Sequence, residues 1–283
     1  MEFLKFLQSE SCRLPHYLLI GSPISHSVSP LMHNIALEHH GLKAEYHAVS
    51  VRNSEISSLI AHFNKLEFLG ANVTIPYKET LFDAMDTLGV EAAQIGAINT
   101  ILKRDAKIVG ENTDAYGFKV PIEQYEDELA GERAIIFGTG GATKAISFAL
   151  YEMGIEEIAM VSRRPGQYDL SEEIIMCNYD NWHAYAEEAA IIINATPLGM
   201  VPNTDASPVK EHETDILEGK ICYDVVYNPR ETKFLKQAKA SGGIPIEGLD
   251  MLIHQGARSF KLWTGHEFPL GLIKMKLDDV FPD

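Results

Sequence analysis

The sequence predicts an α/β protein made of two α/β domains, each with a mostly parallel sheet covered by helices. Short apolar runs alternate with helical patterns along the chain, and this alternation is typical of parallel sheets. A glycine-rich turn near residue 138 follows one apolar run and opens a helical pattern, which indicates that a second β-α-β series begins there. The chain has 283 residues, 46% of them hydrophobic, which is enough to bury two moderate cores.

The first β-α-β series covers residues 1–114. We expect its strands over 16–21, 44–51 and 70–75, with two more around a charged turn within 96–114. We expect its helices over 29–42, 54–66 and 78–89. Ser29 is expected to cap the first of these helices, because serine followed by proline is a common helix start.

The second series covers residues 115–248. We expect its strands over 133–137, 157–165, 190–200, 220–229 and 244–248. Helices are expected from the glycine turn to 154 and over 232–243. An amphipathic stretch over 250–265 has no strand partner in this series, so we expect it to pack on the first domain. The predicted organisation is 1–114 with 249–283 as one domain and 115–248 as the other, with a cleft between them.

Composition excludes several classes of protein. A net charge of −16 argues against nonspecific binding to nucleic acid or anionic membranes, since both need a basic surface. The three scattered cysteines suggest neither a disulfide framework nor a metal site. No leader pattern is seen at the N-terminus, and no apolar run reaches the ~18 residues that a membrane helix needs. We expect a reduced, cytoplasmic protein that binds no metal.

The glycine turn is typical of a dinucleotide site. Gly138 permits the tight turn after the strand, and Gly140 lets backbone amides approach a pyrophosphate. The N-terminus of the following helix favours the phosphate charge. The alternative is an ordinary βα turn, but the clustered glycines favour a Rossmann-type cofactor site.

The end of the next strand predicts which dinucleotide is bound. An acidic residue about 20 residues beyond the glycines would hold the ribose 2′-OH of NAD. Ser162, Arg163 and Arg164 occupy that place instead. Arginine pairs with a 2′-phosphate whereas a carboxylate repels it, so NADP is favoured and Arg163 is the preferred phosphate contact. The alternative is that both arginines are a solvated strand end.

Motifs in both halves of the chain resemble, in order and approximate spacing, those of the shikimate dehydrogenases. The resemblance spans residues 18 to about 265. The motifs that carry it are "SPISHSVSPLMHN", "GANVTIPYK", "GAINT", "GENTDAYGF", "GTGGAT", "INATPLGM", "YDVVYNPRET" and "QGARSFKLWTG". The resemblance implies a substrate-binding, catalytic first domain and a Rossmann NADP-binding second domain. It also implies reduction of 3-dehydroshikimate to shikimate with NADPH, on the route to chorismate and the aromatic amino acids.

The resemblance assigns the catalytic pair to Lys78 and Asp114. Carbonyl reduction develops negative charge on the oxygen, which a lysine ammonium can stabilise and protonate. Asp114 can orient the lysine and bind the same hydroxyl. Without the resemblance, a lone lysine at a strand end would be read as a solvated charge. Residue identity leaves open whether Lys78 carries the proton or acts as an electrostatic anchor.

The resemblance also implies the substrate contacts. Ser27 and Ser29 match the serines that hold the substrate carboxylate, and Ser29 could cap its helix as well. The other matching residues are Thr74, Asn99, Asp114, Tyr227 and Gln255.

The residues expected to contact NADP lie at the glycine turn, at the ends of later strands and before residue 249. They are Gly138, Gly140, Gly141, Ala142, Ser162, Arg163, Arg164, Thr196, Val225 and Gly248. Two departures from the family pattern bear on this site. Ser-Arg-Arg replaces the more usual Asn-Arg-Thr, and Asp250 stands where a glycine is frequent.

Two rival functions stay open at this point. One is a quinate/shikimate dehydrogenase that uses NAD or both cofactors. The other is an NADP-binding sensor that has lost turnover, although such a protein would be expected to lack Lys78, Asp114 or Gln255, and all three are present. Small-molecule substrate is the only partner expected, with no nucleic acid and no membrane, in a monomer or homodimer.

Overall fold

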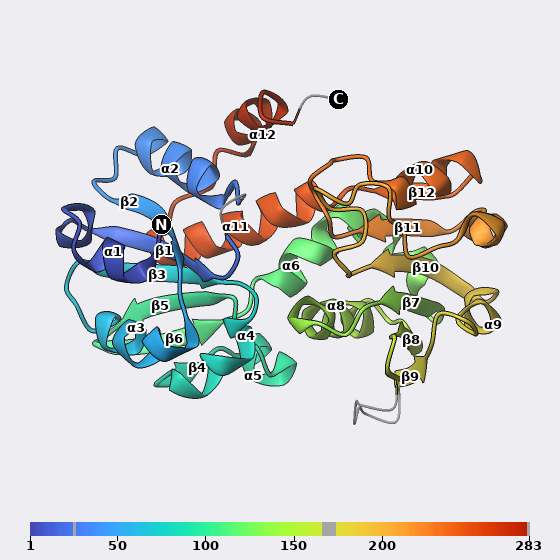
Figure 1. The fold of residues 1–283 in the computed structure, drawn as a ribbon, viewed down its shortest axis with the longest axis horizontal. Coiled ribbons are helices and arrows are strands. Elements are labelled where there is room, and N and C mark those ends of the chain that lie inside the picture. Colours follow the sequence, from blue (N-terminus) through green and yellow to red (C-terminus); the bar gives the residue numbers. More distant parts are fainter. Residues whose placement is uncertain (25–26, 166–173, 282–283) are drawn as a thin grey trace. The chain divides into compact units, whose positions relative to one another are not determined.

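The computed structural model describes residues 1–24, 27–165 and 174–281. The chain forms two compact units. Unit 1 comprises Met1–Asp114 and Gln255–Leu277, and unit 2 comprises Ala115–His254 and Asp278–Asp283. Each unit contains a six-stranded sheet with helices (Figure 1). The predicted fold class is therefore confirmed, while the division of function between the two domains stays a prediction.

The sheet of unit 1 is parallel on one side and antiparallel on the other. Its strand order is β2-β1-β3-β5-β6-β4. β1 pairs in parallel with β2 and β3, whereas β5 runs antiparallel to β3 and β6. The turn between β5 and β6 consists of Asp105 and Ala106, both with positive φ, as a two-residue hairpin of type I′ requires. The strands are β1 (His16–Gly21), β2 (Glu45–Ser50), β3 (Phe68–Val73), β4 (Thr87–Leu88), β5 (Thr100–Arg104) and β6 (Lys107–Glu111).

The helix predicted over 78–89 is shorter than expected. Helix α4 (Tyr77–Thr80) ends early, and a 3-10 turn (Phe82–Ala84) leads into β4. The helix ends early because Asp86 joins the edge of the sheet. Its backbone N–H donates to Ile108 O of β6, and its carboxylate accepts the Ile108 N–H. The other helices that lie mainly in unit 1 are α1 (Phe3–Leu7), α2 (Ser29–His39), α3 (Ile56–His62), α5 (Val90–Ile95) and α12 (Leu270–Asp278).

The predicted cap of α2 is wrong. The helix begins at Ser29 itself, and Val28 precedes it without a side-chain cap. The Ser27 hydroxyl instead accepts the Ser29 N–H at 3.2 Å. Ser27 therefore satisfies a backbone donor at the start of the helix, and the hydroxyl of Ser29 has no capping role.

The sheet of unit 2 is fully parallel, with strand order β12-β11-β10-β7-β8-β9. Its central strands are almost continuously apolar and buried, as a parallel sheet covered on both faces requires. Strand β9 was not predicted. The strands are β7 (Arg133–Phe137), β8 (Glu157–Val161), β9 (Ile174–Cys177), β10 (Ala189–Asn194), β11 (Ile221–Asp224) and β12 (Ile244–Ile246).

The helices that lie wholly or for several residues in unit 2 are, in chain order, α6 (Asp114–Lys119), α7 (Glu126–Leu129), α8 (Gly141–Glu152), α9 (His183–Ala186), α10 (Lys233–Ala240) and α11 (Gly248–Thr264). Helix α11 has 17 residues and contributes to both units. Within the described ranges, no helix combines the length and apolarity needed to cross a bilayer.

A buried carboxylate ties together two loops of unit 2. Asp224, at the end of β11, accepts hydrogen bonds from Asn194 Nδ2 (3.0 Å), from the Val226 N–H (2.9 Å) and from the Thr232 hydroxyl (2.6 Å). Its side chain is fully buried. Burial raises the pKa of Asp224 from 3.8 to about 6, although the three donors oppose the shift.

We predict that Asp224 makes stability depend on pH. Its pKa is higher in the folded than in the unfolded protein, so its contribution is complete below the unfolded value of 3.8 and is lost as the pH rises through about 6. The free energy of unfolding of the wild type, minus that of Asp224→Asn, should fall by about 2 kcal/mol between about pH 4.5 and about pH 7. Urea unfolding at several pH values measures this difference.

The exposed Asp205 provides the control, because Asp205→Asn makes the same change of charge at a position that is not buried. A difference between wild type and Asp224→Asn that stays constant with pH would contradict the raised pKa.

Candidate active site

Unit 1 contains a buried ion pair. Lys78 Nζ contacts Asp114 Oδ2, and the two residues are only 9% and 6% exposed. Lys78 lies on α4 and Asp114 is the first residue of α6. Because lysine and aspartate are rarely buried without a partner, the pair accounts for both burials.

The sheet brings these residues together from distant parts of the sequence. The Val73 N–H at the end of β3 donates to Asn99 O at 2.7 Å, and the Asn99 N–H donates to Glu111 O of β6 at 3.0 Å. Lys78 follows β3, Asn99 precedes β5, and Asp114 follows β6. The ends of three strands therefore place all three side chains at one edge of the sheet.

Asn99 joins the ion pair and is itself held in one orientation. Its Nδ2 donates to Asp114 Oδ1 at 2.7 Å and lies 3.3 Å from Gln255 Oε1. Its Oδ1 accepts the Thr113 backbone N–H at 2.7 Å. Because a backbone N–H can only donate, this bond fixes the oxygen of the amide and so directs the nitrogen to Asp114.

The other predicted substrate residues lie outside this cluster. The hydroxyls of Ser27 and Ser29 are 3.2 Å apart at the start of α2. Thr74 follows β3, where its methyl group packs so closely on Gly21 that a Cβ there would lie 2.3 Å away. Tyr227 follows β11 in unit 2, and its ring packs edge-on against Phe281.

Sequence reasoning missed a set of polar residues that surround Asn99. They are the buried residues Asn72, Thr100, Thr113 and Ser259. Each of these residues lies within one of the motifs quoted above, so the sequence indicated that its segment is part of the site. The sequence did not indicate its contacts, because these depend on side-chain rotamers and on the packing of α11 beside the sheet.

The predicted cofactor residues gather at the carboxyl ends of the parallel strands of unit 2. Gly138 follows β7 with φ +109°, and a Cβ on it would lie 3.0 Å from Ala195 O beyond β10. A Cβ on Gly248 would lie 2.6 Å from the carbonyl carbon of Val225. Ligands of open parallel sheets bind at such an edge.

The turn before α8 fits a phosphate group. Gly140 is the N-cap, no side chain caps the helix, and Gly141 and Ala142 form its first turn. A Cβ on Gly140 would meet no atom within 4 Å, so this backbone borders open space. The free N–H groups and the helix dipole are suited to a pyrophosphate there.

The arginines lie at the end of the neighbouring strand. In the β7–β8 pairing Phe137 lies opposite Val161, which places Ser162 beside the glycine turn. The hydroxyl of Ser162 accepts the Arg164 N–H at 3.1 Å, and both arginines are exposed. They are therefore available to an anionic group at this edge.

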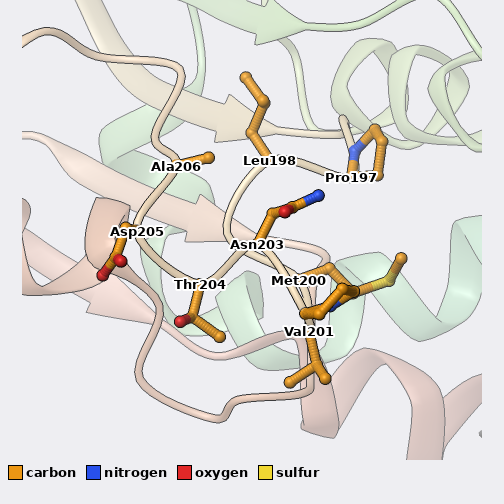
Figure 2. Close-up of a pocket in the computed structure, with 9 residues that line it drawn as sticks. Pro197, Leu198, Met200, Val201, Asn203, Thr204, Asp205 and Ala206 are labelled. Carbon is orange, nitrogen blue, oxygen red and sulfur yellow. The ribbon is translucent and has the colours of Figure 1, made fainter.

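The loop after β10 forms a surface pocket of about 600 Å³ (Figure 2). The pocket-forming segment begins directly after Thr196, but none of the predicted site residues lines the pocket. The lining residues are Pro197, Leu198, Met200, Val201, Pro202, Asn203, Thr204, Asp205 and Ala206. No group of three or more His, Cys, Asp or Glu side chains suited to a metal ion occurs among the residues that the structure describes.

Comparison with known proteins finds one family at two separate segments of the chain. The family model described as "Shikimate dehydrogenase substrate binding domain" matches residues 19–101. The model described as "Shikimate 5'-dehydrogenase C-terminal domain" matches residues 248–277. A curated relative, the shikimate dehydrogenase (NADP(+)) of Moorella thermoacetica, is 38% identical over 266 residues, with 90% of each chain covered.

Solved structures agree. Shikimate 5-dehydrogenase of Thermus thermophilus, in complex with NADP(H) and shikimate, is 33% identical with a TM-score of 0.82, and the match covers 95% of this chain and 100% of that one. Quinate dehydrogenase of Corynebacterium glutamicum, in complex with NAD, is 25% identical with a TM-score of 0.81, covering 94% and 99%. By sequence and by fold, the chain belongs to the shikimate dehydrogenase family.

Proposed function

We propose that this chain is an NADP-dependent shikimate dehydrogenase in which Lys78 and Asp114 act at the reacting oxygen. The observation that carries the assignment of these residues is their buried ion pair, with Asn99 on the second carboxylate oxygen. A charged pair buried at the end of a sheet costs free energy. Because a buried ion pair is weak evidence for added stability, a role in function accounts for this pair better.

The pair suits the reduction of a carbonyl. When NADPH is bound, it supplies a hydride to the carbonyl carbon of 3-dehydroshikimate, and negative charge develops on the oxygen. The Lys78 ammonium stabilises that charge and donates a proton to it. Asp114 orients the ammonium and accepts a hydrogen bond from the hydroxyl that forms. In the reverse direction, the same groups withdraw the hydroxyl proton of shikimate.

The remaining polar residues bind the rest of the substrate. The paired hydroxyls of Ser27 and Ser29 donate to the substrate carboxylate. Gln255 binds a ring hydroxyl close to the ion pair. Asn99 joins it when substrate replaces one of the present contacts of its Nδ2 with Thr113, Asp114 or Gln255. Thr74 and Tyr227 supply further contacts. With a net charge of −16, local donors rather than the overall field must attract this anion.

NADP fits the carboxyl edge of the unit 2 sheet. The glycine turn and the N-terminus of α8 hold the pyrophosphate, and Arg163, with Arg164 beside it, pairs with the 2′-phosphate. Thr196, Val225 and Gly248 line the same edge. The relative from T. thermophilus, solved with NADP(H) and shikimate, supports this choice.

A quinate dehydrogenase that uses NAD is the second candidate, because one structural neighbour has that name and cofactor. The residues Ser162–Arg164 oppose it, since they offer no carboxylate to a free 2′-OH. The purified protein should be assayed with shikimate or quinate and with NADP or NAD, by cofactor absorbance. Fastest turnover with shikimate and NADP supports the proposal, and fastest turnover with quinate and NAD contradicts it.

The three cysteines are all free in the structure, which supports the proposal of a reducing, cytoplasmic compartment. A monomer or a homodimer remains the expected assembly.

We predict that Lys78→Ala removes most turnover while cofactor binding is nearly unchanged. Loss of one transition-state donor typically lowers kcat by about 10²–10³. Steady-state rates and NADPH fluorescence titration measure the two effects, with the exposed Lys107→Ala as the matched control. A Lys78→Ala enzyme that keeps more than half of the wild-type kcat would show that Lys78 is not catalytic.

We predict that Ser27→Ala and Ser29→Ala both raise KM for shikimate, because each removes a hydroxyl from the carboxylate site. Only Ser27→Ala should also lower stability, by about 1 kcal/mol, since its hydroxyl accepts a backbone N–H at the start of α2. Kinetics and thermal melts separate the two effects, and the exposed Ser57→Ala is the control. Unchanged KM in both variants would refute the carboxylate role.

We predict that Arg163→Ala raises KM for NADP about ten- to a hundredfold and leaves KM for NAD nearly unchanged, because a hydrogen bond to a charged group is worth roughly 1.5–3 kcal/mol. Arg164 can cover part of the loss, so the double variant should be measured too. The exposed Arg104→Ala in unit 1 is the control. Equal weakening of both cofactors would show that Arg163 stacks on the adenine and does not read the phosphate.

A further inference from the structure

We propose that Ser259 is a positioning residue for the Lys78–Asp114 pair, because it closes a ring of hydrogen bonds that holds the Asn99 amide on Asp114. The inference rests on the proposed function, since it takes this pair as the reacting site. Ser259 lies on α11, far in the sequence from the other members of the ring.

The ring consists of one amide and three hydroxyls. Asn99 Nδ2 donates to Thr113 Oγ1 at 2.9 Å, and Thr113 Oγ1 lies 3.0 Å from Ser259 Oγ. Ser259 Oγ lies 2.8 Å from Thr100 Oγ1, which donates to Asn99 Oδ1 at 2.9 Å. All four residues are at most 2% exposed, so these groups depend on one another for hydrogen bonds.

Counting protons gives the ring one direction. Asn99 Nδ2 can only donate to Thr113, and Asn99 Oδ1 can only accept from Thr100. Each hydroxyl carries one proton. The Thr113 proton has two acceptors within reach, Ser259 Oγ at 3.0 Å and Asn99 Oδ1 at 3.1 Å. Because Asn99 Oδ1 already accepts from the Thr113 N–H and from Thr100, we assign the Thr113 proton to Ser259, whose own proton then goes to Thr100. Hydrogen bonds that run in one sense polarise and strengthen one another.

Ser259 has no spare capacity in this arrangement. Besides accepting from Thr113, its oxygen accepts from Asn72 Nδ2 at 2.9 Å. The orientation of Asn72 is fixed, since its Nδ2 also donates to the Asn99 carbonyl and its Oδ1 lies 2.8 Å from the Tyr46 hydroxyl. The Gln255 carbonyl, one helical turn back at 3.0 Å, is a competing acceptor, but the Thr100 contact is shorter.

The consequence reaches Asp114 through the second N–H of the Asn99 amide. That N–H binds Asp114 Oδ1 at 2.7 Å while Lys78 binds Oδ2. If the ring opens, the Thr113 backbone N–H alone still holds the Asn99 amide oxygen, so the amide turns more freely about that bond and the carboxylate loses its fixed angle to Lys78.

Two variants separate hydrogen bonding from packing. Ser259→Ala removes the hydroxyl, whereas Ser259→Cys nearly keeps the volume but donates and accepts only weakly. Thr264→Ala is the matched control, because Thr264 Oγ1 makes the same one-turn bond on α11, to Phe260 O at 2.8 Å, and lies outside the ring. The measurements are kcat per folded enzyme, KM for shikimate and for NADP, and the thermal midpoint.

We expect both Ser259 variants to lower kcat roughly five- to thirtyfold, the loss that follows when buried donors lose a partner, with KM for NADP changed by less than about twofold. Thr264→Ala should lower the thermal midpoint at most and keep kcat within about twofold. A wild-type kcat in Ser259→Cys, or equal kcat in Ser259→Ala and Thr264→Ala, would overturn the inference, because packing alone would then explain Ser259.

If the wild type turns over neither shikimate nor quinate, the proposed function fails. The hydrogen-bonded ring is then tested separately, by the urea concentration at which each variant is half unfolded. Either Ser259→Ala or Asn99→Ala opens the ring, so the double variant should shift the midpoint by clearly less than the sum of the single shifts. Additive shifts would overturn the ring.

Discussion

The burial of Lys78 against Asp114 is the constraint on which the rest of unit 1 depends. Taking two charges out of water costs several kcal/mol for each ion, and direct attraction repays this only with good geometry and further hydrogen bonds. The mixed sheet provides that geometry, since β3 and β6 end and the antiparallel β5 begins at one edge. Asn99 provides a further hydrogen bond, and its own amide is fixed by a backbone N–H.

Unit 2 forms its predicted cofactor site mainly from backbone groups at the ends of parallel strands. A fully parallel sheet gathers several strand ends at one edge, and each predicted cofactor residue lies at or near such an end. Backbone packing requires glycine at Gly138 and Gly248, where a Cβ would meet neighbouring carbonyl groups. Asp224 has a structural role, since its hydrogen bonds connect the loops after β10 and β11. The groups available to a ligand at this edge are backbone amides and arginines.

The sequence was sufficient where local chemistry determines structure. The glycine turn before α8 follows from residues that tolerate its backbone angles, and the polar charged run around Asp105 marks the hairpin, although Ala106 takes a positive φ that alanine rarely adopts. It failed where tertiary contacts compete with local preference. Ser29 follows the rule for a cap, yet Ser27 accepts the N–H, and the helix after Lys78 breaks because Asp86 pairs with β6.

The same limit applied to the site: residues within local motifs could be predicted, and residues placed by long-range packing could not. The family motifs named Lys78, Asp114 and Asn99, but Ser259 enters only through the packing of α11, which no local pattern reports. The most direct test of the central claim is a crystal structure of the complex with NADP and shikimate. Lys78 Nζ and an Asp114 carboxylate oxygen should each lie about 2.6–3.2 Å from the same ring hydroxyl, on the carbon that faces the nicotinamide. A shikimate hydroxyl at that carbon that contacts neither residue would contradict the account.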